Sequence, residues 1–135
     1  MSRRLRKLAK RGRKLRELDD RARHTFRINA KKLRYASEFF ASLYDGRKAT
    51  GRRKALDKAL KKLQDQLGPL NDAAVHERVS FELVTAGDVP SPERSVRQAY
   101  AAGAVNALEG QAAGDAMDLA QREASRLSPD LAFWT

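Results

Sequence analysis

Hydrophobic residues recur along the chain at the three- and four-residue spacing of an α-helix, and no segment sustains the alternation of a half-buried strand. Glycine and proline interrupt this pattern at Gly46, Gly68, Pro69, Gly87, residues 90–92 and Pro129. The pattern therefore predicts an all-α fold. We expect a helical bundle of about four to five helices that forms a single domain over residues 1–135.

Two long helices are predicted in the first part of the chain. Residues 2–18 are expected to form a basic helix, and a second helix is expected from the N-cap residues Asp19 or Asp20 to about Tyr44. The apolar seam of the first helix, which suits packing in a bundle, consists of Leu5, Leu8, Gly12 and Leu15. The core stripe of the second is expected to consist of Phe26, Asn29, Leu33, Ala36, Phe40 and Leu43.

The remaining sequence predicts three further helices. The third, capped by Thr50, is expected to end at Gly68, because Pro69 disfavours its continuation. Its buried side is expected to consist of Leu56, Leu60, Leu63 and Leu67. A fourth is expected over residues 73–86, with Asn71 and Asp72 as caps and Gly87 as its stop. The last is expected to begin at Ser91, Pro92 and Glu93 and to end near Leu127, with close helix contact or a bend at Gly103, Gly110 and Gly114.

Charge adds a strong asymmetry to this picture. The 135 residues carry a net charge of +11, but residues 1–62 carry +17 and residues 63–135 carry −6. Solubility alone needs a net charge of only about 2 to 8 for a domain of this size. The excess in the first half favours a surface that meets a polyanion, although a merely solvated basic face is the simpler alternative.

Several classes of function find no support in the sequence. The chain has no cysteine, which excludes disulfides, thiolate zinc sites and cysteine nucleophiles. No apolar run reaches the roughly 18 residues of a membrane span, so no membrane partner is expected. His76 lacks a second histidine at metal-binding spacing, and no phosphate loop, nucleophile elbow or carboxylate cluster is visible. We therefore expect no catalytic residue, no metal and no cofactor.

Two rows of cations are predicted to bind phosphate. On the second predicted helix, the row lies within about one third of the circumference, opposite the core stripe. On the third, four lysines gather on the side away from the leucines. The rows consist of His24, Arg27, Lys31 and Arg34, together with Tyr35 and Glu38, and of Lys54, Lys58, Lys61 and Lys62. Lys32 and the arginines of the first helix are secondary candidates.

The string His24-Thr-Phe-Arg-Ile-Asn-Ala-Lys-Lys-Leu-Arg-Tyr-Ala-Ser-Glu-Phe39 resembles the signature of the CHAD family, the conserved histidine α-helical domain. Residues 60–72, which contain Leu-Gln-Asp, Leu-Gly and Asn-Asp, are similar to a second family segment, and Phe133-Trp134 is similar to the end of many members. The residues that match the family motif in the basic rows are His24, Arg27, Lys31, Arg34 and Lys62.

The resemblance implies a fold of two related four-helix bundles and the binding of inorganic polyphosphate, often at cytoplasmic polyphosphate granules. It also implies a CYTH triphosphate-processing domain as a frequent companion. The chain is similar to the C-terminal half of the family domain and has one histidine motif. We therefore expect either that it is a fragment of a longer protein or that a second copy, as in a homodimer, or a separate partner completes it. Tyr35 and Glu38 are expected to orient the cations or to pack between helices.

Two other functions fit the same charges. One is nonspecific binding of nucleic acid by a basic helical protein, although few aromatic residues are available for stacking on bases. The other is an accessory module of an enzyme that processes triphosphate or polyphosphate. We therefore expect non-enzymatic binding of polyphosphate, with these two as the alternatives.

Overall fold

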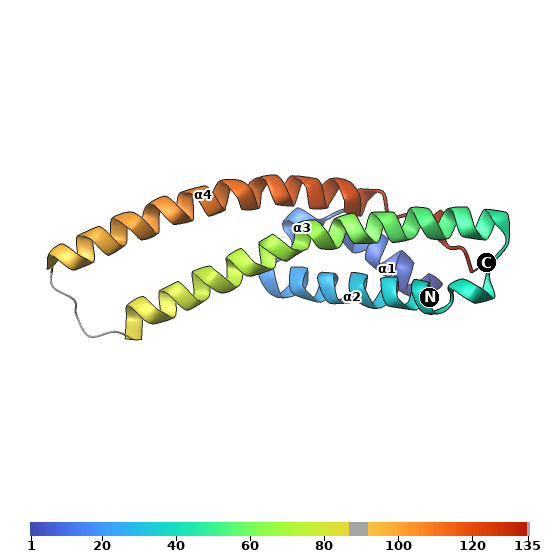
Figure 1. Cartoon of the computed structure of the whole chain (residues 1–135), viewed down its shortest axis with the longest axis horizontal. Coiled ribbons are helices and arrows are strands. Elements are labelled where there is room, and N and C mark those ends of the chain that lie inside the picture. Colours follow the sequence, from blue (N-terminus) through green and yellow to red (C-terminus); the bar gives the residue numbers. More distant parts are fainter. Residues whose placement is uncertain (87–91, 135) are drawn as a thin grey trace.

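The computed structural model describes residues 1–86 and 92–134, and all regular structure in these residues is helical (Figure 1). The predicted all-α fold is confirmed. Four α-helices are separated or followed by single turns of 3-10 helix. In chain order the elements are α1 (Ser2–Gly12), η1 (Leu15–Glu17), α2 (Asp20–Phe39), η2 (Ala41–Leu43), α3 (Arg47–Ala86), α4 (Pro92–Ser125) and η3 (Pro129–Leu131).

The core lies at the end of the molecule where all four α-helices meet. Helix α3 contacts both α2 and α4, and α1 packs against α2 and α4 (Figure 1). The C-terminal segment closes this end, because Phe133 is buried and Trp134 Nε1 donates a hydrogen bond of 2.7 Å to Ser2 Oγ. The largest fully buried side chains are Phe26, Phe133, Leu5, Leu15, Leu33, Leu56, Leu60, Leu63, Leu127 and Ser37.

Helices α3 and α4 extend beyond α1 and α2 as a two-helix arm (Figure 1). Large apolar side chains are exposed on this arm, among them Tyr100, at 82%, and Leu108, at 71%. His76 and Glu109, whose Nδ1 and Oε1 atoms lie 3.5 Å apart, link the two helices. The arm therefore depends on contact between two helices, whereas the four-helix end has a buried core.

The predicted first helix is divided into α1 and η1, although all four residues of its seam are buried as expected. Gln121 of α4 explains the break. Its Nε2 donates to the Gly12 carbonyl at 2.8 Å, and its Oε1 accepts from the Arg16 N–H at 3.2 Å. One side chain thus satisfies two backbone groups that an uninterrupted helix would have paired internally.

Helix α2 begins as predicted, with the Asp19 carboxylate accepting a hydrogen bond from the Ala22 N–H at 2.7 Å. It ends at Phe39, earlier than expected, and the chain turns so that the Tyr44 ring packs edge-on against Phe133. Part of the predicted core stripe is consequently wrong. Asn29 and Leu43 are exposed, and the buried positions of α2 are Phe26, Ala30, Leu33 and Ser37.

The predicted end of the third helix at Gly68 is wrong, because α3 continues through Pro69 to Ala86. Asn71 and Asp72 are therefore interior residues and do not cap a separate helix. Pro69 is exposed, while Leu63 and Leu67 are buried just before it. Packing on that side holds the helix together at the position where proline removes one backbone hydrogen bond. The four predicted core leucines of this helix are all buried.

The other helix boundaries agree with the sequence to within a few residues. Helix α3 begins at Arg47, before Thr50, and α4 ends at Ser125. Pro92 is the first residue of α4, whereas the stop at Gly87 and the start at Ser91 lie outside the described residues. Close helix contact or a bend was expected at Gly103, Gly110 and Gly114 of α4. The close contact is wrong, since no atom beyond the helix's own nearby backbone lies within 4 Å of a Cβ built there, and the bend stays a prediction.

Close packing of α1 against α4 is predicted to make any larger residue at Gly12 destabilising. A Cβ at Gly12 would lie 3.0 Å from Ala124 Cβ and 3.1 Å from its carbonyl oxygen. We expect Gly12→Ala to lower the free energy of unfolding by about 1–2 kcal/mol, measured by urea denaturation. Gly51→Ala, where no atom lies within 4 Å of the new Cβ, should instead raise it by about 0.5–1 kcal/mol. A stabilising Gly12→Ala change would contradict this packing.

Candidate functional site

A column of three polar residues on α3 holds α2 in place. Asp57, Gln64 and Asn71 follow one another at intervals of seven residues, which places them on one side of the helix. Asp57 Oδ1 accepts a hydrogen bond from Ser37 Oγ at 2.7 Å, Gln64 Oε1 accepts one from Arg34 at 3.2 Å, and Asn71 Oδ1 lies 3.0 Å from His24 Nδ1. These contacts set the antiparallel register of the two helices. We call Asp57, Gln64 and Asn71 the polar column.

The cationic row of α2 lies along its contact with α3. This position differs from the open, outward face that the helical projection predicts, because α3 covers one edge of the row. Arg27 and Lys31 lie between His24 and Arg34 and are half-buried. Neither has a carboxylate partner among residues 1–86 and 92–134. Two positive charges are therefore held beside α3 without neutralisation by a carboxylate of the described residues.

Arg34 is the most constrained cation of the row. Besides its bond to Gln64, its Nε lies 3.3 Å from Glu38 Oε1, although the two atoms are not aligned as a hydrogen bond. Its guanidinium carbon lies 5.3 Å from the centre of the Tyr35 ring. Tyr35 and Glu38 thus both contact Arg34, which fits the first of the two roles expected of them, to orient the cations. Gln64 Nε2 is buried without a hydrogen-bond partner, which leaves a donor unused next to Arg34.

The lysines of α3 divide between two sides of the helix. Lys61 precedes Gln64 by three residues and Lys54 precedes Asp57 by three, so both are neighbours of the polar column on the helix surface. Lys58 is exposed about 120° from Gln64 around the helix. Lys62 lies on the opposite side, where its Nζ is 3.9 Å from Glu123 Oε1 of α4.

The structure therefore brings together only part of the predicted site. Lys62 faces α4, and Lys32 is exposed on α2 about 140° from Arg27, so neither joins the row. We define the α2–α3 seam as the cations and amides that do converge. They are His24, Arg27, Lys31 and Arg34 of α2 with Gln64 and Asn71 of α3, and we include Lys61, which helix geometry places beside Gln64. Gln64 and Asn71 were not among the predicted site residues, although the seven-residue spacing marks them.

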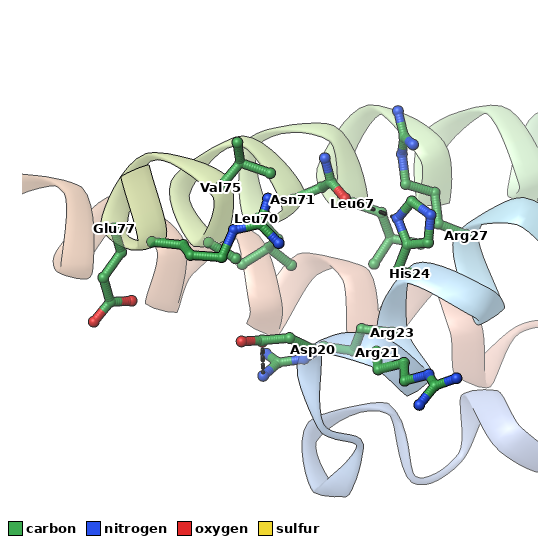
Figure 2. Close-up of a pocket in the computed structure, with 12 residues that line it drawn as sticks. Asp20, Arg21, Arg23, His24, Arg27, Leu67, Leu70, Asn71, Val75 and Glu77 are labelled. Atoms are coloured by element: carbon green, nitrogen blue, oxygen red, sulfur yellow. Dashed lines mark hydrogen bonds and ion pairs between the residues drawn. The ribbon is translucent and has the colours of Figure 1, made fainter. Parts of the chain in front are cut away.

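A cavity of about 850 Å³ adjoins one end of the seam (Figure 2). Arg27 and His24 of α2 line it, and one of the dashed lines in Figure 2 joins His24 to Asn71. Its α3 wall includes Leu70 and Val75, which lie beyond Pro69. The cavity could not be predicted from a helix that ends at Gly68, because the cavity exists only where α3 continues past the start of α2.

Helix α1 carries a separate basic surface. Its cations are exposed and have no ion-pair partner among the described residues. They are Arg3, Arg4, Arg6, Lys7, Lys10 and Arg11. In the described part of the chain, no three histidines, cysteines or carboxylates gather as a metal site, and no helix combines the length and apolarity needed to cross a bilayer.

Comparison with known protein families identifies one match. A sequence profile of the CHAD domain matches residues 1–79, which include the histidine motif and the segment at residues 60–72. Phe133-Trp134 lies outside the match, and the assignment to the C-terminal half of the domain stays a prediction. No curated protein and no solved structure matches the chain.

The buried bond from Ser37 to Asp57 is predicted to stabilise the contact between α2 and α3. Ser37 is fully buried, so Ser37→Ala removes a donor to a carboxylate that water reaches poorly. We expect a loss of about 1–2 kcal/mol in the free energy of unfolding by chemical denaturation. Ser42→Ala, at an exposed position of η2, is the control and should change stability by less than about 0.5 kcal/mol. Equal effects of the two substitutions would contradict a structural role for this bond.

Proposed function

The chain belongs to the CHAD domain family, and from that premise we propose that it binds inorganic polyphosphate along the α2–α3 seam. The observation that carries the proposal is the pair of half-buried cations, Arg27 and Lys31, that no carboxylate of the described residues neutralises. His24 and Arg34 extend the row on either side of them and are held by amides of α3. The seam thus presents a line of positive charge that suits a linear polyanion.

Electrostatic cost supports the same proposal. Like charges at spacings of three and four residues on a helix repel by a few tenths of a kcal/mol per pair. A phosphate chain would reverse this repulsion and would release its condensed counterions on binding. Amide contacts to Gln64 and Asn71 orient Arg34 and His24, and of the four residues of the row only Arg34 also has a carboxylate neighbour among the described residues, Glu38 at 3.3 Å. The arrangement therefore favours an anionic ligand over internal ion pairing.

Each cation of the seam has a distinct role in this proposal. Arg27 and Arg34 bind phosphate oxygens in bidentate fashion, whereas Lys31 and Lys61 act as point charges. The Asn71 carbonyl oxygen accepts from His24, so the imidazole hydrogen stays on Nδ1. His24 then donates to phosphate through Nε2, which carries a hydrogen only in the protonated ring.

Nucleic acid is the main alternative ligand. Packed helices lie only about 8–10 Å apart, and a seam between them suits a thin inorganic chain better than a duplex. The exposed cations of α1 are more accessible to a duplex, because they project from one helix face. Substitutions in the seam should therefore weaken polyphosphate binding, whereas substitutions in α1 should weaken nucleic-acid binding.

Other parts of the proposal rest on the family alone. We propose that binding is non-enzymatic, that the protein is cytoplasmic and gathers at polyphosphate granules, and that a CYTH-type domain or a second copy of the chain accompanies it. An accessory role beside a triphosphate- or polyphosphate-processing enzyme is compatible with the same binding surface. The seam supports these statements only because it supplies a site for polyphosphate, the ligand that they have in common.

Replacement of the two unpaired cations tests the proposed site. We expect Arg27→Ala with Lys31→Ala to weaken polyphosphate binding about tenfold or more at 0.1 M salt and to reduce its salt slope by about 1.5. Helicity should be unchanged, because neither side chain has an ion-pair or hydrogen-bond partner among the described residues. Titration of labelled polyphosphate at several salt concentrations gives both quantities, and the polyphosphate should be recovered at its original length.

The matched control is Lys7→Ala with Lys32→Ala, which removes the same charge from exposed positions outside the seam. We expect it to change affinity less than threefold, since only long-range attraction is lost. An equal loss of affinity in the two double variants would mean that only diffuse electrostatic attraction holds polyphosphate, and it would refute the seam as the binding site. Displacement of polyphosphate by duplex DNA at equal phosphate concentration would contradict the preference for an inorganic chain.

A further inference from the structure

The cavity at the end of the seam has an apolar wall that an inorganic polyanion does not use. Leu67, Leu70, Ala74 and Val75 of α3 line it, and Val75 is 44% exposed although it is aliphatic. Helix α2 begins at Asp20 and covers α3 only up to this point, so the wall continues the contact surface of α3 past the end of its partner. A ligand with an apolar body would cover this wall.

Charge is distributed unevenly around the cavity. His24 and Arg27, which also belong to the seam, lie at one end, and Glu77 lies at the other (Figure 2). Asp20 is paired with Arg23 at 2.8 Å on the α2 side, and Arg23 Nε is buried without a hydrogen-bond partner. Arg21, Arg23 and Arg78 also line the cavity, so cations surround the apolar wall, and Glu77 offers a carboxylate acceptor at the end away from His24. Phosphates, a flat organic body and a hydroxyl or amino donor match these three features.

We propose that the cavity and the seam together bind a nucleoside 5′-polyphosphate, with the nucleoside against Leu70 and Val75 and the phosphates on His24, Arg27 and Lys31. The inference rests on the proposed function, because it uses the seam as the phosphate site. A volume of about 850 Å³ lies within the range of roughly 300–1,000 Å³ typical of small-molecule sites. An alkyl phosphate would cover the apolar wall but would leave the carboxylate of Glu77 without a ligand donor.

Comparison of two ligands that share a triphosphate isolates the contribution of the cavity. ATP and inorganic tripolyphosphate are titrated into the full chain by calorimetry without divalent cations. We expect ATP to bind about tenfold more tightly, since burial of about 60 Å² of apolar surface is sufficient for that ratio. Decyl phosphate is the third ligand and is expected to bind more weakly than ATP.

Substitution of the apolar wall then locates the gain. Val75→Asn should lower the affinity for ATP severalfold and leave that for tripolyphosphate unchanged. Val79→Asn is the matched control, because Val79 is 40% exposed on the same helix and does not line the cavity. Leu70→Ser is a second test at the same wall and should have the same selectivity as Val75→Asn. Circular dichroism of each variant confirms that α3 is intact.

The outcomes separate this inference from the proposed function. Equal affinities of ATP and tripolyphosphate in the unsubstituted protein would overturn the nucleoside site and leave the seam standing. If the protein binds neither ligand and also fails to bind longer polyphosphate chains, the proposed phosphate site along the seam is refuted. Tighter binding of decyl phosphate than of ATP would overturn the assignment to a nucleoside in favour of an alkyl phosphate.

Discussion

The contact of α2 with α3 through the polar column is the constraint on which the site depends. Three hydrogen-bonding contacts, to Asp57, Gln64 and Asn71, connect helices whose facing sides also bury Phe26, Leu33, Leu60 and Leu63. Hydrogen bonds of this kind contribute about 1 kcal/mol each, which is larger than the repulsion between neighbouring cations on one helix face. The column can therefore hold a row of like charges in register without neutralising it.

Continuation of α3 past Pro69 gives the molecule its second feature. The first part of α3 packs within the four-helix end, whereas the later part forms the arm with α4 (Figure 1). At the junction, α3 loses its cover from α2, and an apolar wall borders the cations of His24 and Arg27. A site with both charge and apolar surface thus arises from the difference in length between two neighbouring helices.

The periodicity of the sequence was sufficient to predict the all-α fold class, the buried leucines of α3 and which cations belong to the row on α2. It was not sufficient for the placement of the cations, because a helical projection shows which residues share a face but not which helix covers it. Lys62 illustrates this limit, since the motif includes it but its position on α3 lies toward Glu123 of α4 and away from α2. The break after Gly12 depends on Gln121, more than a hundred residues away, and no local pattern reveals that contact. At Pro69 the local pattern predicts the end of a helix, but packing on the other side of α3 overrides this local preference.

A crystal structure of the full chain with inorganic polyphosphate bound would test the central claim most directly. The phosphate chain is predicted to lie along the α2–α3 seam, with oxygens within hydrogen-bonding distance of Arg27 and Lys31 and with Gln64 and Asn71 still in contact with Arg34 and His24. Phosphate bound only to the exposed cations of α1, with the seam empty, would contradict the account.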